Sequence, residues 1–227
     1  MPPSEQSRVA ELRRRFRRRR FERIEALIRD ILKERDSAHI LDVGGTTKYW
    51  ALLDPELYGR VHVTVLNTEA ELAIHRADDL GIAFEEVQGD GCAMPQYTDG
   101  AFDLVHSNSV LEHVGSYTRM IEFAVETRRV GRAYYVQTPY LWFPIEPHYL
   151  VPFLHWLPDA LRIRLHSSFR MGRARRVSYP EAMVRADIVR MVDKPLMRAL
   201  FPDGELVRER WMLMTKSLTA IRPPTNG

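Results

Sequence analysis

The segment from Ala38 to Trp50 constrains the fold most strongly. A short apolar run reaches two consecutive glycines, Gly44 and Gly45, without a polar loop in between. Such a run is typical of a buried parallel strand followed by a tight turn, where the backbone can approach a ligand closely. Ligands of open α/β sheets bind beyond the carboxyl ends of the strands. We therefore expect Asp42 and both glycines at the mouth of a crevice.

From residue 36 onward, short apolar runs alternate with stretches of helical periodicity, which predicts a parallel sheet covered by helices on both faces. Strands are predicted at residues 39–44, 61–66, 83–88, 102–107 and 132–138. Helices are predicted near 68–80 and 116–130 and from Pro180 towards Leu200. Two terminal strands are predicted at Glu205–Met212 and Lys216–Ile221. The fold class is therefore α/β.

Residues 139–180 interrupt this pattern and are expected to form an inserted lid. They contain eight aromatic residues, and prolines at 139, 144, 147, 152 and 158 exclude an uninterrupted helix. Their six arginines against two acidic residues give a charge of +4. Aromatic faces suit sugar rings, quinoid rings or acyl chains, and arginines suit phosphate or carboxylate. The aromatics could equally form a small core of the lid itself.

The amino-terminal segment is strongly basic. Residues 1–23 contain nine arginines and three glutamates, a charge of +6 in a chain of net +3, which leaves about −3 for the remainder. Because the basic character is local, nucleic-acid binding over the whole surface is unsupported. The arginines form either a solvated helix face or a surface, residues 8–23, that meets anionic membrane, phosphate or a partner.

Apolar residues in the same segment predict a helix with two stripes. Val9, Leu12 and Phe16 share one face, and a second stripe follows after a break at residues 17–20. The second stripe, which is expected to pack on the domain, comprises Phe21, Ile24, Leu27, Ile28 and Ile31. We expect a basic helical segment at 1–35, one domain at 36–222 and a flexible tail at 223–227.

Composition bounds the location and the chemistry. The single cysteine, Cys92, excludes an intramolecular disulfide, and the histidines at 106, 113, 148 and 155 lack zinc-site spacing, so no metal site is predicted. No apolar run approaches 18 residues, and the amino terminus lacks the apolar segment of a secretory signal. The expected location is the cytoplasm, with peripheral membrane contact as the alternative.

Three motifs together resemble the class I S-adenosylmethionine-dependent methyltransferases, in particular the small-molecule, type 11-like branch. They are Leu41–Gly45 (LDVGG), Gln88–Gly91 (QGDG) and Phe102–Val114 (FDLVHSNSVLEHV). The resemblance implies a Rossmann-like doubly wound sheet, an antiparallel carboxyl-terminal hairpin and S-adenosyl-L-methionine as the cofactor. The chain departs from the family where Thr46 and Lys48 replace the second and third spaced glycines of the turn.

The resemblance also implies cofactor contacts at the first two strands. Gly44 and Gly45 would approach the methionyl and ribose parts, and Asp42 would hold the ammonium group directly or through water. At the end of the second strand the family commonly has an acid for the ribose hydroxyls. This chain offers Asn67, with Glu69 two residues further on.

The later strands supply the remaining expected contacts. Asp90 resembles the family's acceptor for the adenine amino group, and the amides of Gly91 and Cys92 would serve the ring nitrogens. Asn108 follows the fourth strand, where the methyl group is expected to emerge.

Methyl transfer requires an oriented acceptor and the removal of one proton. His113, beside Glu112, is the preferred base, because a neutral imidazole can accept a proton near neutral pH. His148, with Glu146 two residues before it, is the competing base. Either histidine could instead be a packing residue.

The predicted reaction is methyl transfer to a hydroxyl oxygen of a small or amphipathic acceptor of lipid or glycan type. A nicotinamide-dependent reductase is disfavoured because the turn lacks the Gly-x-Gly-x-x-Gly spacing. Methylation of nucleic-acid bases is disfavoured because residues 107–110 replace the expected proline-rich turn. A non-catalytic binding or membrane-associated module stays open, favoured by Thr46, Lys48 and Asn67.

Overall fold

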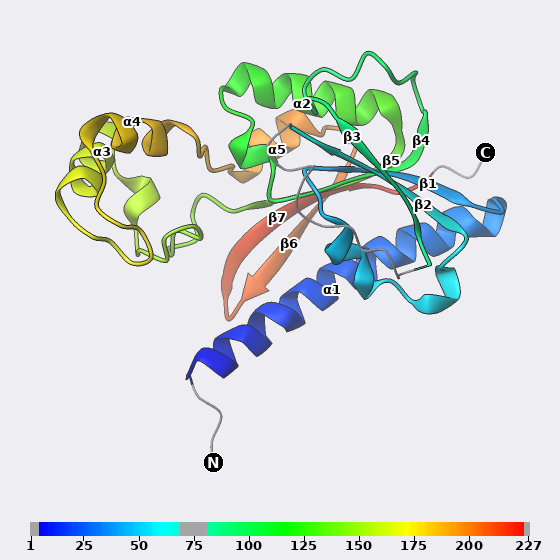
Figure 1. Cartoon of the computed structure of the whole chain (residues 1–227), viewed down its shortest axis with the longest axis horizontal. Helices are drawn as coiled ribbons and strands as arrows, with labels where there is room; N and C mark the ends of the chain where they lie inside the picture. Colours follow the sequence, from blue (N-terminus) through cyan, green and yellow to red (C-terminus); the bar gives the residue numbers. More distant parts are fainter. Residues whose placement is uncertain (1–4, 69–80, 225–227) are drawn as a thin grey trace.

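The structure is a computed structural model that describes residues 5–68 and 81–224, with side chains from residue 15 onward. Its centre is a seven-stranded sheet in the order β3-β2-β1-β4-β5-β7-β6 (Figure 1). The strands are β1 (Ala38–Val43), β2 (Val61–Asn67), β3 (Ala83–Gln88), β4 (Phe102–Asn108), β5 (Gly131–Pro139), β6 (Glu205–Trp211) and β7 (Met214–Arg222).

The first five strands are parallel, and the β6–β7 hairpin joins β5 in antiparallel orientation. All seven predicted strands are therefore confirmed, including the terminal hairpin. The strand order reverses at β1, which pairs with β2 on one side and with β4 on the other. Such a reversal opens a crevice at the carboxyl ends of the two central strands.

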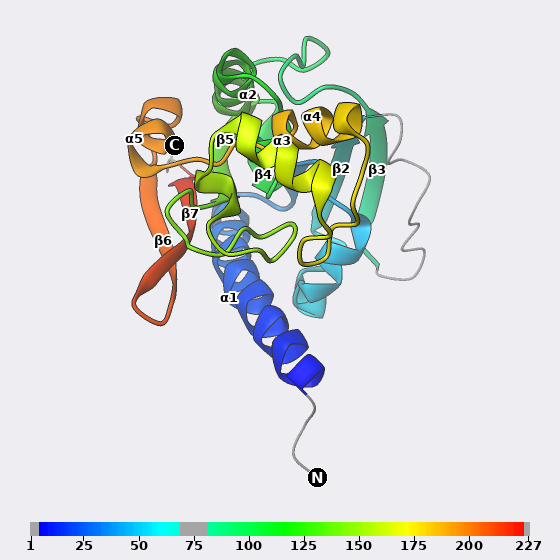
Figure 2. The same cartoon turned by 90° about the vertical axis from the view of Figure 1, so that its left-hand side faces the viewer.

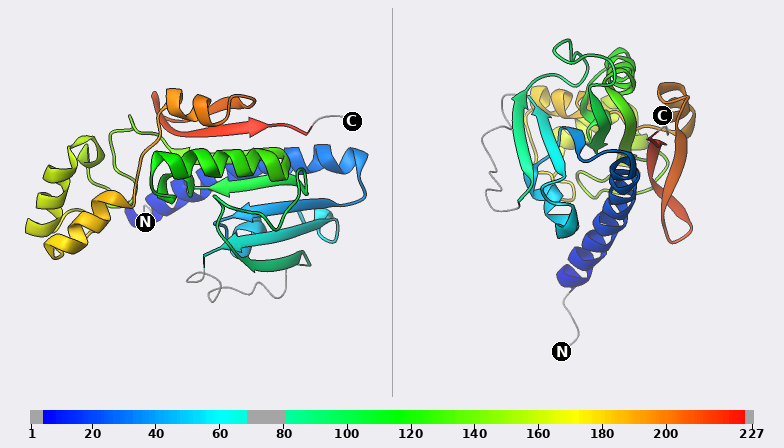
Figure 3. Two further views of the ribbon diagram at one scale, coloured as in Figure 1. Left: turned by 90° about the horizontal axis from the view of Figure 1, so that it is seen from above. Right: turned by 90° about the vertical axis from the view of Figure 1, so that its right-hand side faces the viewer.

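Helices cover both faces of the sheet. Helices α2 (Tyr117–Val130) and α5 (Lys194–Leu200) lie on one face, and α1 (Glu5–Glu34) lies on the other (Figures 1 and 3). The short 3₁₀ helices η1 (Thr47–Leu52) and η2 (Pro55–Leu57) follow β1 and pack on the same side as α1. The predicted helix at 116–130 is confirmed, and most of the one near 68–80 lies outside the described residues.

Helix α1 is a single helix of 30 residues, so the predicted amino-terminal helix is confirmed, and the arginines at 17–20 interrupt only its apolar stripe. Arginine is a good helix former, and a run of arginines does not interrupt the backbone hydrogen bonds. The second apolar stripe packs on the sheet as predicted: Phe21, Ile24 and Ile28 are fully buried. The side chains of Val9 and Leu12 lie outside the described part.

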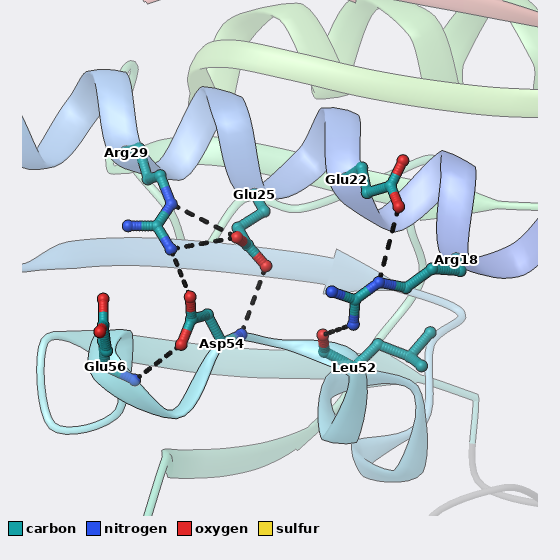
Figure 4. Close-up of polar contacts among 7 residues, drawn as sticks. All are labelled: Arg18, Glu22, Glu25, Arg29, Leu52, Asp54 and Glu56. Atoms are coloured by element: carbon teal, nitrogen blue, oxygen red, sulfur yellow. Dashed lines mark hydrogen bonds and ion pairs between the residues drawn. The ribbon is translucent and has the colours of Figure 1, made fainter.

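Polar contacts fix α1 to the loop that follows η1 (Figure 4). Arg29 donates to Asp54 Oδ2 at 2.6 Å and to Glu25 Oε1 at 3.2 Å. Nearer the amino end of the helix, Arg18 Nη1 donates to the backbone oxygen of Leu52, the last residue of η1, at 3.2 Å. Each of these exposed contacts contributes little to stability, so the buried apolar stripe provides most of the energy that holds α1 on the sheet.

The segment between β5 and β6 extends beyond the carboxyl ends of the strands. Its helices α3 (Asp159–Ser168) and α4 (Tyr179–Asp187) form a separate lobe (Figures 1 and 2). The single helix predicted from Pro180 to Leu200 is wrong, because α4 ends at Asp187 and α5 begins at Lys194. Between them Val192 O accepts from Leu141 N at 2.9 Å, and Asp193 caps α5 by accepting from Leu196 N.

The packing of α1 yields a stability prediction. Replacing Phe21 with alanine should lower the free energy of unfolding by about 3–5 kcal/mol, because it removes a fully buried aromatic ring. Arg19→Ala on the exposed side of the same helix should change it by less than about 0.5 kcal/mol. Urea unfolding followed by circular dichroism measures both values. Equal small effects would show that α1 is not part of the cooperative core.

Candidate functional site

A cavity of about 670 Å³ lies at the carboxyl ends of β1, β4 and β5. Its floor is the turn after β1, and its walls come from α1, from the lid segment at residues 139–150 and from the β6–β7 hairpin. Cavities of this size hold small-molecule ligands. The predicted crevice is therefore present at the predicted edge of the sheet.

The turn after β1 has room only for glycine. Gly44 has φ +71°, and a Cβ atom on it would lie 2.4 Å from Val110 Cγ2. A Cβ on Gly45 would lie 1.8 Å from Asp42 Oδ2. Asn67 holds this turn, since its Nδ2 donates to the backbone oxygen of Gly45 at 2.9 Å.

Asp42 is fully buried, and each of its carboxylate oxygens has a partner. His106 Nδ1 lies 2.6 Å from Oδ1, and Trp50 Nε1 donates to Oδ2 at 2.8 Å. His106 comes from β4, where it stands opposite Asp42 in the strand register. A buried carboxylate requires such partners, because an unpaired charge away from water is strongly destabilising.

The same contact orients the imidazole of His106. Its ring stacks on Tyr49 at 5.3 Å between centroids and on Tyr135 at 5.8 Å. The remaining nitrogen, Nε2, is buried and has no hydrogen-bond partner within the described part of the chain. His106 lines the cavity. An Asp–His pair with one ring nitrogen unused is an arrangement that can accept a proton.

Positive charge gathers around the cavity. Two acidic residues, Asp42 and Glu209, line it together with five cationic ones: Arg17, Arg20, Lys48, Arg173 and Lys216. Arg20 reaches in from α1, where its Nη1 donates to Asn108 Oδ1 at 2.9 Å and its Nε lies 3.2 Å from Glu209 Oε1. The basic helix thus contributes to the wall of the cavity, which the sequence does not predict.

Of the predicted cofactor residues, Asp42, Gly44, Gly45 and Asn108 line this cavity. Asn67, Asp90, Gly91 and Cys92 are not among its lining residues.

Asp90 instead forms an ion pair with Arg119 and accepts from the backbone N–H of Cys92 at 2.9 Å. Cys92 lines a separate surface hollow, and burial raises the pKa of its thiol to about 12.

The predicted bases form a cluster beside the cavity. The Nε2 atoms of His113 and His148 lie 3.1 Å apart, and Glu146 Oε1 lies 2.5 Å from His148 Nδ1. Glu112 is fully buried, its Oε2 accepts from Thr138 Oγ1 at 2.9 Å, and burial raises its pKa to about 7. Neither histidine is among the residues that line the cavity.

The sequence of residues 41–133 matches a family described as "Methyltransferase domain". These residues include the glycine turn, Asp42, His106 and the Glu112–His113 pair. No curated protein matches the chain.

Several solved structures share the fold at low sequence identity. A protein from Pyrococcus horikoshii OT3 is 16% identical, with 90% of this chain and 91% of that chain covered and a TM-score of 0.53. A protein from Methanosarcina mazei, described as a SAM-dependent methyltransferase, is 12% identical, with coverage of 82% and 92% and a TM-score of 0.50. An O-methyltransferase family protein from Burkholderia thailandensis is 15% identical, with coverage of 84% and 52% and a TM-score of 0.51.

The shared fold confirms the α/β fold class expected from the sequence, with its mostly parallel sheet and antiparallel hairpin. Residues 41–133 are thus similar to a methyltransferase domain, and most of the chain shares its fold with a protein described as a SAM-dependent methyltransferase.

Proposed function

We propose that this enzyme methylates a hydroxyl oxygen of a small acceptor that carries a carboxylate or phosphate group. The observation that carries the proposal is the Asp42–His106 pair in the wall of a cavity lined by cations. The pair can take up the proton that the hydroxyl loses, and the cations can hold the acceptor's negative charge.

The residues of the cavity fit S-adenosylmethionine. The glycine turn allows close backbone approach, and the guanidinium of Arg20 and the amide of Asn108 offer donors for a carboxylate. The cofactor supplies a methyl group activated by its sulfonium. Because both oxygens of Asp42 already have partners, we assign this residue to positioning His106 rather than to holding the ammonium group. The ribose and adenine contacts expected from Asn67, Asp90, Gly91 and Cys92 stay predictions.

His106 is the proposed base. A carboxylate at Nδ1 holds the ring with its proton on that atom, which leaves a lone pair on Nε2. The imidazole is only 1% exposed, so an acceptor reaches Nε2 after a movement of Tyr49, the cavity residue that stacks on the ring. Tyr49 lies in the short helix η1.

His113 and His148, the bases predicted from the sequence, are the competing candidates. The Nε2 atom of each faces the other, and both residues stand outside the cavity lining. This arrangement favours His106, and kinetics of the three variants would distinguish them.

The acceptor is proposed to be anionic because the cavity has a clear excess of positive charge. Glu209 neutralises part of this charge, because it forms ion pairs with Arg20 at 3.2 Å and with Lys216 at 3.7 Å, whereas Arg173 is exposed at the lid.

We expect Arg173→Ala to raise KM for an acceptor with a carboxylate or phosphate several-fold and to leave kcat nearly unchanged. An equal effect on an uncharged analogue would contradict the charge argument.

Two glycines with the same backbone conformation provide a test of the cofactor site. Gly44→Ala places a Cβ 2.4 Å from Val110, whereas Gly59, at φ +72°, has no atom within 4 Å of such a Cβ. Both variants carry the same backbone strain, but only Gly44→Ala should weaken S-adenosylmethionine binding, by at least about tenfold. Isothermal calorimetry measures the affinities. Equal losses, or none, would remove this turn from the cofactor site.

The proposed base has its own test. His106→Gln and Asp42→Asn should each lower kcat by roughly 100- to 10,000-fold while cofactor affinity stays within a few-fold. Radiolabelled methyl transfer to hydroxyl acceptors that carry a carboxylate or phosphate is the assay. His62→Ala, an exposed histidine of β2, is the matched control and should retain wild-type turnover. If the kcat of His106→Gln stays within a few-fold of the wild-type value, and that of His113→Ala or His148→Ala does not, the base is misassigned.

A second proposal concerns residues 8–23, which we propose contact an anionic membrane peripherally. Within the described residues, no helix is long and apolar enough to span a membrane. Two observations favour surface contact. Arg15, Arg18 and Arg19 are exposed on α1, and the β6–β7 hairpin, which extends to the same side (Figures 1 and 2), exposes Leu213 at its tip by 95%. Lys216 Nζ lies 4.0 Å over the ring of Phe16 and joins the two elements.

Vesicle co-sedimentation tests this second proposal. The double variant Arg15→Glu and Arg19→Glu should lose most binding to vesicles with anionic lipid, and binding of the wild type should fade as salt rises, because exposed charges are screened. Leu213→Ser should weaken binding less and without a salt dependence of its own. Unchanged sedimentation of the double variant would leave the arginines as a solvated helix face.

A further inference from the structure

We propose that Glu112, His113 and His148 bind one divalent transition-metal ion, with Zn²⁺ as the best-suited ion. The three residues come from two segments: η3 (Leu111–His113) follows β4, and His148 lies in the lid segment. Each offers one ligand atom, and these atoms all lie within 4.8 Å of one another. Two imidazoles and one carboxylate are a common ligand set for zinc.

The two imidazole nitrogens already have the required separation. In a tetrahedral site with Zn–N bonds of about 2.0–2.1 Å, two nitrogen ligands lie roughly 3.3 Å apart. The Nε2 atoms of His113 and His148 lie 3.1 Å apart. The rings stand nearly perpendicular, at 84° between planes.

A second layer of contacts orients His148. Glu146, which is itself buried, lies 2.5 Å from His148 Nδ1 and also accepts from the backbone N–H of Tyr149 at 2.6 Å. A carboxylate at Nδ1 places the proton on that atom and leaves Nε2 free to bind a metal. Such outer contacts accompany most histidine ligands of metal ions.

The third ligand is a carboxylate oxygen that lacks a partner. Glu112 is fully buried, and Thr138 satisfies its Oε2. Its Oε1 has no hydrogen-bond partner among the residues the structure describes. Burial of an unpaired carboxylate oxygen is costly, and a cation beside it would remove that cost. His113 is exposed, so the fourth position of the ion is open to water on that side.

A metal ion here would tie the lid to the core of the domain. Ile145, Pro147 and Leu150 flank His148 in the chain and line the cavity. An ion bound to η3 and to His148 would therefore fix one wall of the cavity. It would also occupy the Nε2 lone pairs of both histidines, which excludes them as bases for methyl transfer.

Equilibrium dialysis of the full, tag-free chain against Zn²⁺ tests the site, with bound metal measured by elemental analysis. Wild-type protein should bind one ion per chain. His113→Ala, a change at an exposed residue, should lower the affinity at least about 100-fold, and Glu146→Gln should lower it roughly 10- to 100-fold through loss of the outer contact. His62→Ala removes one ring of the exposed His39–His62 stack and should leave the affinity unchanged.

Co²⁺ provides a second readout that does not depend on activity. The wild-type complex should show the strong visible absorption of tetrahedral cobalt, and His113→Ala should lose it. Metal should also raise the melting temperature of the wild type but not of this variant, since binding only to the native state stabilises it. Binding far below one ion per chain, or equal losses in His113→Ala and His62→Ala, would overturn the proposal.

Discussion

The hydrogen bond between the buried carboxylate of Asp42 and His106 links the two central strands at the point where the sheet opens. The carboxylate is also held by Trp50 and packs against the backbone of Gly45, so one buried charge fixes the turn, the helix η1 and the imidazole together. Loss of one hydrogen-bond partner from a buried polar group costs about 1–3 kcal/mol, and more when the group is charged. Stability and the proposed chemistry therefore depend on the same contact.

The main elements of the fold are predictable from the sequence because their signals are local. Most of the parallel strands are short apolar runs, and Gly44 and Gly45 mark the first turn directly. The wrong prediction concerns one helix. The proline at 195 starts a new helix after Asp193 instead of continuing the helix predicted from Pro180. Here the Asp193 cap, rather than local periodicity, determines where the helix begins.

The site is less predictable, because its residues meet only through tertiary structure. The glycine turn and Asn108 lie at the cavity as their positions after strands predict. His106 was overlooked as a base, although it stands opposite Asp42 once β1 and β4 are paired, so the register contains that signal. Arg20 could not be found in this way, because its place in the cavity depends on how α1 crosses the sheet. Asp90, predicted at the adenine, pairs with Arg119 across 29 residues of chain.

The most direct test of the account is a ¹⁵N–¹H correlation spectrum of the histidine rings, recorded with and without S-adenosylmethionine. The account predicts that His106 carries its proton on Nδ1, held by Asp42, and that its Nε2 signal moves when the cofactor fills the cavity. A proton on Nε2, or a His106 signal that does not respond at saturating cofactor, would contradict the claim that this histidine stands at the reacting centre.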